Sequence, residues 1–182
     1  INVRKLWENS NITARFPGLA ARARFDEPMR EHTTFRVGGP ADIFVEPVCV
    51  EELIAIVGLF SSEGVPVSVL GGGSNLLVAD RGIRGAVVSL SRLDSMTVPS
   101  PPDGFPPGLV PVRVGAGRSM NSLTEWCADR DLAGLERFAG LPGSVGGAVF
   151  MNARCYDIAI ADVFFAAECL QFGTEGCTIQ HA

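Results

Sequence analysis

The sequence predicts a mixed fold of helices and strands divided into two lobes. Three observations support this prediction: a strand, helix, strand pattern over residues 41–90, a proline-rich stretch over residues 99–111, and clusters of glycine on both sides of that stretch. Six prolines in thirteen residues exclude a helix or a central strand there. We therefore predict a first lobe over residues 1–98, a crossing over 99–111 and a second lobe over 112–182.

The first lobe is expected to hold a parallel unit. Residues 41–45 form an apolar run, and residues 51–62 follow as a predicted helix that Gly64 ends. The apolar positions of this helix have a three-four spacing: Leu53, Ile54, Val57 and Phe60. Residues 65–70 form a short β-branched run, and residues 85–90 are another strand candidate of similar length. A strand, a helix and a further strand in this order indicate parallel pairing.

The second lobe is expected to begin with a strand over residues 110–114. Ser119 is a predicted N-cap of a helix that ends near Asp131. One face of this helix carries Leu123, Trp126 and Cys127. Residues 163–170 and 177–179 read as two strands on either side of a turn over 173–176.

Composition limits the function classes. The chain has 182 residues, of which 47% are hydrophobic and 19% charged, so it can bury a core as one domain or two small lobes. A net charge of −5 argues against a nucleic-acid partner. No window approaches the roughly 20 apolar residues of a membrane helix, and residues 1–10 lack a signal-peptide core, so we expect a cytoplasmic protein without a membrane partner.

Neither the cysteines nor the histidines indicate a metal site. The five cysteines are scattered without a CxxC pair, which predicts reduced, structural thiols. His32 and His181 are the two histidines, which exclude a multi-histidine site and give no Ser-His-Asp arrangement. His32 is a candidate base and Arg36 a candidate anion partner, but an ordinary surface role is favoured for His32, and neither residue is predicted to be catalytic.

The first glycine loop is a candidate anion site. It runs from Gly71 to Asn75 directly after a predicted strand, with the sequence Gly71, Gly72, Gly73, Ser74, Asn75. Three successive glycines can adopt positive φ and aim consecutive amides at one point, where a pyrophosphate fits. The loop lacks the Lys-Ser/Thr of a P-loop and the Rossmann spacing. The alternative is an ordinary flexible turn.

A second glycine loop spans residues 139–148. Its four glycines and Pro-Gly turn predict a surface on which a flat ring lies against the backbone. The alternative is a tight turn into a glycine-weakened helix packed on a sheet. Gly115 and Gly117 form a third close-approach turn, which by itself is more often structural than functional. For Trp7, Trp126, Cys155 and Tyr156 simple packing is the favoured interpretation.

Four segments in this order resemble the MurB family of UDP-N-acetylenolpyruvoylglucosamine reductases: HTTFRVGGPADIFVEP, VLGGGSNLLVADRGIRGAVV, VGAGRSMNSL and GLERFAGLPGSVGGAVFMNA. The resemblance runs from about His32 to Leu170. It implies an α+β fold, namely a two-lobed FAD-binding domain of the vanillyl-alcohol-oxidase (PCMH) type. In the family a separate substrate domain follows, and this chain resembles the FAD domain alone, with the start of the next segment at its end.

The resemblance implies FAD as cofactor, and because neither glycine loop contains histidine, we expect the FAD to be held non-covalently. Its pyrophosphate would lie on Gly71, Gly72, Gly73, Ser74 and Asn75. The isoalloxazine and ribityl chain would lie against Gly140, Leu141, Pro142, Gly143, Ser144 and Gly147. Asn152 is implied near the flavin, and Gly117 is a weaker candidate.

The family reaction takes hydride from NADPH through the flavin to the enolpyruvyl double bond of a UDP-sugar, giving UDP-N-acetylmuramate for peptidoglycan. The family's later Gly-Tyr-Arg segment, proton-donating serine or cysteine and C-terminal glutamate have no counterpart here. No catalytic residue is therefore predicted, and the 182 residues are expected to bind FAD without completing the reduction. The oligomeric state stays open.

One loop departs from the family pattern, which usually has Asn-Ala-Gly followed shortly by Tyr-Gly. Here Arg154 and Asp157 replace the glycines, which predicts a differently shaped loop. Two other functions stay open. One is a non-catalytic flavin or nucleotide-binding remnant. The other is a flavin oxidase with a covalent tether at Cys155, which is weaker because neither glycine loop contains histidine.

Overall fold

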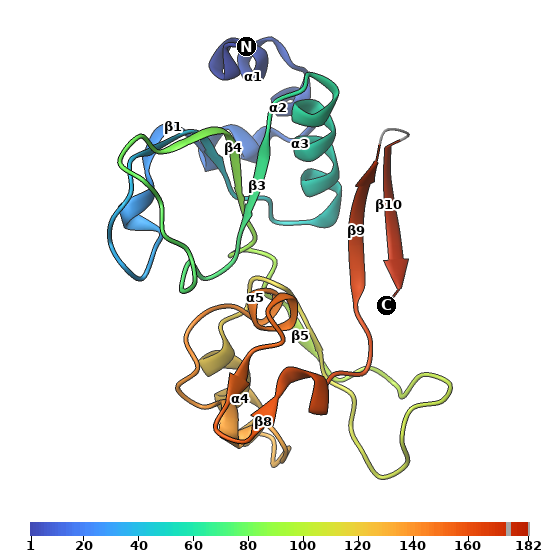
Figure 1. The fold of residues 1–182 in the computed structure, drawn as a ribbon. Coiled ribbons are helices and arrows are strands. Elements are labelled where there is room, and N and C mark those ends of the chain that lie inside the picture. Colours follow the sequence, from blue (N-terminus) through green and yellow to red (C-terminus); the bar gives the residue numbers. More distant parts are fainter. Residues whose placement is uncertain (174–175, 182) are drawn as a thin grey trace.

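A four-stranded sheet forms the centre of the first lobe in the computed structural model, which describes residues 1–173 and 176–181 (Figure 1). The strands are β1 (Ala23–Pro28), β2 (Pro40–Val45), β3 (Val67–Leu70) and β4 (Ile83–Ser89), in the order β1-β2-β4-β3. Three α-helices, α1 (Val3–Asn9), α2 (Ile12–Arg15) and α3 (Val50–Ser62), and two 3-10 helices, η1 (Pro17–Arg22) and η2 (Met29–Glu31), complete it.

The predicted parallel unit is confirmed. β2 pairs with β4 and β4 pairs with β3, both in parallel, whereas β1 pairs with β2 antiparallel. α3 connects β2 to β3 and covers almost the same residues as the helix expected over 51–62. The chain leaves β3 at Leu70, so the first glycine loop lies at the carboxyl end of a parallel strand.

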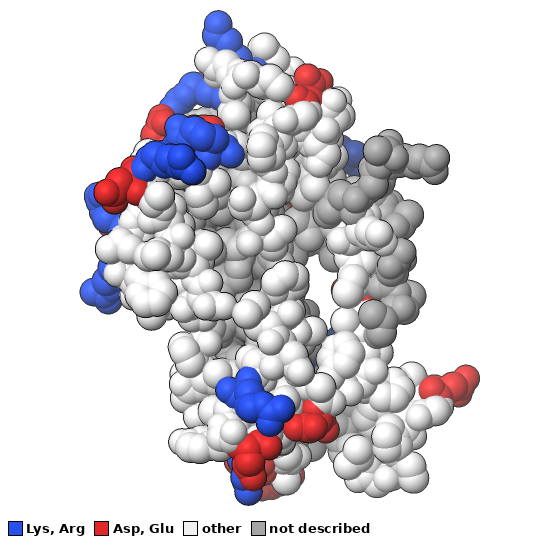
Figure 2. Space-filling view, in the orientation of Figure 1, with Lys and Arg blue, Asp and Glu red and all other residues white. Residues whose placement is uncertain are grey.

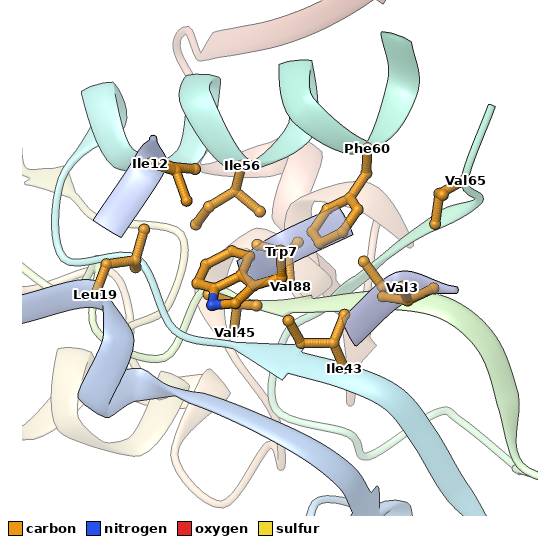
Figure 3. Packing of buried hydrophobic residues seen from close by; sticks show 11 residues of the cluster. Val3, Trp7, Ile12, Leu19, Ile43, Val45, Ile56, Phe60, Val65 and Val88 are labelled. Carbon is orange, nitrogen blue, oxygen red and sulfur yellow. The ribbon is translucent and has the colours of Figure 1, made fainter. Parts of the chain in front are cut away.

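Apolar side chains cover both faces of this sheet. On one face, α1, α2 and α3 bury Trp7, Ile12, Ile56 and Phe60 with the sheet residues Ile43, Val45 and Val88 (Figure 3). On the other face a second cluster contains Met29, Ala41, Phe44, Leu70, Val78 and Val87. Because both faces are covered, β4 is buried over five successive residues, as in parallel sheets generally.

A charged contact attaches α3 to the segment before β1. The Arg22 guanidinium donates to both carboxylate oxygens of Glu52, at 2.6 and 2.7 Å. Glu52 also accepts a hydrogen bond from the Val48 amide at 2.8 Å. The Glu52 side chain is only 7% exposed. The hydrogen bond from Arg22 holds the pKa of Glu52 below its ordinary value, despite burial.

The second lobe is built from short elements. They are β5 (Met96–Thr97), β6 (Arg113–Val114), α4 (Met120–Ala128), η3 (Glu136–Phe138), α5 (Val145–Phe150), β7 (Arg154–Cys155), β8 (Ile158–Ala159) and η4 (Ile160–Asp162). Their common core contains Met120, Leu123, Cys127, Phe138, Ala148 and Ile160. Ser119 caps α4 as predicted, accepting from the Ser122 amide, although the helix ends at Ala128 and not near Asp131. The strand expected over residues 110–114 is limited to Arg113–Val114.

The proline-rich segment over residues 99–111, predicted to cross between the lobes, instead lies within the second lobe. β5 pairs antiparallel with β6, so residues 98–112 connect two strands of one small sheet. Met96 packs on the core of the second lobe, whereas Leu90 packs on the core of the first. We therefore place the passage between the lobes at residues 91–95. Proline content indicates that a segment is irregular, but it does not indicate which elements the segment joins.

The chain continues into a hairpin of β9 (Glu168–Gly173) and β10 (Gly176–His181), which lies beside α3 (Figure 1). The predicted strand over 163–170 starts later than expected, since residues 164–167 have no regular structure. The predicted turn over 173–176 includes residues 174–175, which lie outside the described residues. Among the described helices, none has both the length and the apolar character needed to cross a membrane.

Candidate functional site

The first glycine loop uses its three glycines in two ways. Gly73 has a φ of 64°, a conformation that favours glycine, and a Cβ there would overlap the carbonyl oxygen of His32. Gly71 and Gly72 do not have positive φ, contrary to the expectation for three successive glycines. Their missing side chains leave space for the second glycine loop instead.

The second loop combines a turn with the start of a short helix. Gly140 and Gly143 have φ values of 87° and 112°. Ser144 is buried and caps α5, since its Oγ accepts a hydrogen bond from the Gly147 amide at 3.2 Å. The turn into a glycine-containing helix is therefore present, but α5 contributes to the core of its own lobe.

The two loops, one from each lobe, touch through their backbones. A Cβ on Gly72 would lie 2.6 Å from the Gly143 Cα, and one on Gly71 would overlap the Ser144 Oγ. The Ser74 hydroxyl donates to the Pro142 carbonyl at 3.3 Å. Residues 71–74 of the first loop thus lie directly beside residues 142–144 of the second.

Several main-chain donors at this contact have no acceptor in the protein. Within the described part of the chain, the amides of residues 72–75, and those of Gly143 and Ser144, donate no hydrogen bond. Gly73 and Ser144 are buried, whereas Gly72 and Asn75 are exposed to water. Buried amides are normally paired, so the unpaired amides of Gly73 and Ser144 indicate a place for another acceptor. An anion with several oxygen atoms matches this donor set.

The third glycine turn supports the second loop. Gly117 is packed so closely on the Leu90 carbonyl that no side chain fits. The Ala116 and Arg118 carbonyls accept hydrogen bonds from the amides of Gly146 and Val145, at 2.9 and 2.7 Å. Gly146 was not a predicted site residue, yet a Cβ on it would lie 2.7 Å from the Ala116 Cβ. The sequence gives no signal for this contact because it joins segments about thirty residues apart.

Other predicted site residues have protein partners of their own. The Gly140 amide donates to the Asn121 Oδ1 at 2.8 Å, and Leu141 packs against the core of the second lobe. Asn152 is exposed, and its Oδ1 accepts from the Ala161 amide at 3.0 Å. The amide NH2 group of Asn152 is the part of this side chain that remains for a ligand.

In the loop of residues 152–157, which departs from the family pattern, the two residues that replace glycines do not have positive φ. Asn152 and Tyr156 have φ values of 43° and 54°, whereas Arg154 and Asp157 do not have positive φ. Arg154 pairs with Ala159 in the β7–β8 ladder. The side chains of Arg154 and Asp157 are therefore accommodated without backbone strain at their own positions.

The face of the molecule shown in Figure 2 carries few charged side chains near the contact between the lobes. Figure 2 shows Lys, Arg, Asp and Glu on the outer parts of both lobes, with a largely uncharged surface between them in this view. Arg118 is an exception near the site, and its Nε is buried without a partner among the described residues. The described residues contain no group of three His, Cys, Asp or Glu side chains that could hold a metal ion.

Comparison with protein families finds a match to the FAD binding domain over residues 41–171. Curated relatives include the UDP-N-acetylenolpyruvoylglucosamine reductase of Treponema pallidum, 45% identical over 147 residues, which are 81% of this chain and 40% of the relative. The reductase of Geobacter metallireducens is 43% identical over 159 residues, which are 83% of this chain and 50% of the relative. The chain thus spans about half or less of these relatives.

Solved structures show the same fold. The MurB structure from Thermus caldophilus matches with a TM-score of 0.58 and 30% identity, over 87% of this chain and 51% of that one. The oxidoreductase GilR matches with a TM-score of 0.68 over 88% of this chain and 33% of that one, and its 19% identity supports the fold alone. The predicted two-lobed α+β fold of the PCMH type is confirmed. The chain belongs to the FAD binding domain family, and the curated relatives named above are UDP-N-acetylenolpyruvoylglucosamine reductases.

Proposed function

We propose that the two glycine loops bind one FAD molecule non-covalently at the contact between the lobes. The main observation is the group of unpaired amides at residues 72–75, Gly143 and Ser144. The donors of residues 72–75 fit a pyrophosphate, because its oxygens are acceptors and carry negative charge. A binding site of this kind needs no lysine, which agrees with the absence of a P-loop motif.

The residues divide into two groups within this proposal. Gly71, Gly72, Gly73, Ser74 and Asn75 hold the pyrophosphate through main-chain amides and short side chains. The ribityl chain and the ring system lie against Gly140, Pro142, Gly143, Ser144 and Gly147, with the Asn152 NH2 group nearby. Leu141 and Gly117 serve the same site indirectly, because their observed contacts are with the protein.

The likeness to the reductases supports a proposal for the whole protein. Bound FAD supplies hydride acceptance from NADPH and hydride donation to the enolpyruvyl group of UDP-N-acetylglucosamine enolpyruvate. The product is UDP-N-acetylmuramate, a precursor of peptidoglycan, and the expected compartment is the cytoplasm. In this proposal the residues of this chain bind and orient the cofactor.

We also propose that this 182-residue chain binds FAD but does not by itself reduce the UDP-sugar. It spans 40% of one curated reductase and 50% of another, and no described residue is assigned a catalytic role. Incubation of the 182-residue chain with FAD, NADPH and the UDP-sugar is expected to give no UDP-N-acetylmuramate. Formation of that product at the rate of a complete reductase would contradict this separation.

FAD binding is tested by titrating the purified chain with FAD and following the quenching of flavin fluorescence. Removal of excess ligand followed by acid precipitation then shows how the flavin is held. We expect a saturable signal and a yellow supernatant. The absence of binding would refute the proposal, and a yellow pellet would instead support a covalent tether such as Cys155.

A further inference from the structure

The first glycine loop rests on the turn formed by residues 29–34. The Thr34 amide donates to the Gly73 carbonyl at 3.0 Å, and the His32 carbonyl oxygen occupies the space that a Cβ on Gly73 would need. Thr33 is buried, and its hydroxyl donates to the Val37 carbonyl at 3.1 Å. A displacement of this turn would therefore displace Gly73 as well.

The His32 side chain fixes this turn on the sheet. Its ring stacks on Phe44 of β2, with ring centroids 4.1 Å apart and an interplanar angle of 22°. Its Nε2 lies 2.8 Å from the Glu27 Oε1, and the His32 side chain is 20% exposed. Phe44 belongs to the same buried cluster as Leu70, the residue before the glycine loop. The turn and the loop thus share one support.

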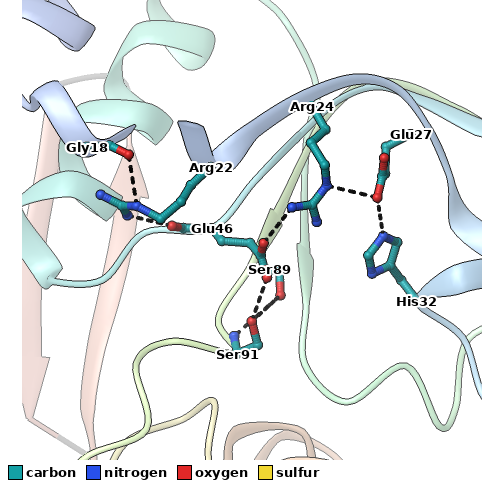
Figure 4. A network of polar contacts seen from close by, with 8 residues as sticks. All are labelled: Gly18, Arg22, Arg24, Glu27, His32, Glu46, Ser89 and Ser91. Atoms are coloured by element: carbon teal, nitrogen blue, oxygen red, sulfur yellow. Dashed lines mark hydrogen bonds and ion pairs between the residues drawn. The ribbon is translucent and has the colours of Figure 1, made fainter. Parts of the chain in front are cut away.

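Glu27 is itself held in place by a network of charged groups (Figure 4). Its Oε1 accepts from the Arg24 Nε at 2.9 Å, and Arg24 donates to the Glu46 Oε2, also at 2.9 Å. The Ser91 hydroxyl donates to the Glu46 Oε1 at 3.0 Å. Although burial acts to raise it, hydrogen bonds from His32 and Arg24 keep the pKa of Glu27 below its ordinary value. An ionised carboxylate can only accept, so the His32 Nε2 is the donor.

We propose that His32 is a positioning residue for the first glycine loop: its contacts with Glu27 and Phe44 hold the turn that seats Gly73. The proposal rests on the FAD site described above, because the consequence for function is the affinity for FAD. His32 contacts the loop through its backbone and does not need to touch the cofactor. Removal of the imidazole leaves Glu27 paired with Arg24, so no buried charge loses its only partner.

Three variants test this role: His32→Leu, His32→Gln and Arg30→Ala. Leucine removes the donor to Glu27, glutamine keeps a donor in a similar position, and Arg30 lies on the same turn in an exposed pair with Glu31. Loss of a hydrogen bond to a charged group predicts about tenfold faster hydrogen exchange of the Thr34 amide and an FAD dissociation constant raised about tenfold in His32→Leu. His32→Gln keeps a donor to Glu27 but loses the stacking on Phe44, so it is expected to restore part of both effects, and Arg30→Ala is expected to match the wild type.

The exchange measurement is made without FAD, so it tests the positioning role even if the chain does not bind FAD. Wild-type exchange of the Thr34 amide in His32→Leu would overturn the proposal. A lower free energy of unfolding in His32→Leu, with unchanged exchange at Thr34 and unchanged FAD affinity, would show a merely structural role and would also overturn it. Failure of the wild type to bind FAD would refute the proposed function separately.

Discussion

Glycine at position 72 is required by a neighbouring residue and not by its own backbone angles. The space that a Cβ would need is occupied by the Gly143 backbone of the other lobe. By contrast, Gly58 lies within α3 and has no atom within 4 Å of an added Cβ. Alanine at position 72 therefore disturbs the contact between the two loops, whereas alanine at position 58 shows the effect of replacing a glycine that has no such contact.

We predict that the methyl group added in Gly72→Ala pushes the two loops apart. The free energy of FAD binding is expected to weaken by at least ~1.4 kcal/mol, which raises the dissociation constant at least about tenfold. Gly58→Ala is the matched control and is expected to stabilise the protein by about 0.4–1 kcal/mol, with unchanged FAD affinity. Fluorescence titration and urea unfolding measure the two quantities. Equal FAD affinity in Gly72→Ala and wild type would show that the contact between the loops is not needed.

The Arg22–Glu52 pair predicts a dependence of stability on pH. The folded-state pKa of Glu52 is lowered, so the contribution of Glu52 is complete above its unfolded pKa of about 4.3 and is lost as the pH falls through the folded value. At pH 7, Glu52→Gln is expected to cost about 2 kcal/mol, since Arg22 keeps a weaker partner. Urea unfolding between pH 3 and 7 is expected to show a smaller loss on acidification in the variant. Identical slopes would contradict this account.

The N-caps of two helices, α4 and α5, allow the role of the second glycine loop to be tested. Ser119 and Ser144 cap α4 and α5, and each accepts from an amide three residues later. Replacement of either by alanine is expected to cost about 1 kcal/mol of unfolding free energy. We expect only Ser144→Ala to weaken FAD binding, because Ser144 also lies against Gly71. A similar FAD affinity in both variants would show that Ser144 caps α5 but takes no part in FAD binding.

The elements that the sequence predicted well have strong periodic or local signals. The spacing of Leu53, Ile54, Val57 and Phe60 predicted α3, and Ser119 identified the start of α4. The two-residue strands β5 to β8 were missed or overextended, because two residues carry no period. The expected strand over 110–114 is reduced to Arg113–Val114 for this reason.

At the scale of the whole molecule, the proline-rich loop is predicted to be dispensable for binding. Residues 98–112 return to the same small sheet, and Phe105 contacts Phe165 at a centroid distance of 4.8 Å. Replacement of residues 99–110 by a turn of about four residues is expected to leave FAD affinity within about twofold of wild type. The lost aromatic contact is expected to cost about 1 kcal/mol. Loss of FAD binding would instead support a crossing that links the lobes.

The two glycine loops could be identified from sequence, but their contact could not. Local glycine and proline signals marked Gly71–Asn75 and residues 139–148, and the resemblance assigned them to one cofactor. Ser74 and Pro142 are 68 residues apart, so their hydrogen bond depends on how the lobes pack. The role of Gly73 against His32 was also not visible, because the sequence favoured an ordinary surface role for His32.

The central claim is that both glycine loops contact one FAD molecule. The most direct measurement is the change in backbone amide NMR signals of the 15N-labelled chain during titration with FAD. We expect the signals of Gly72, Gly73, Gly143 and Ser144 to shift with the same dissociation constant and those of α1 to stay unchanged. Shifts confined to one loop, or located elsewhere on the molecule, would contradict the claim.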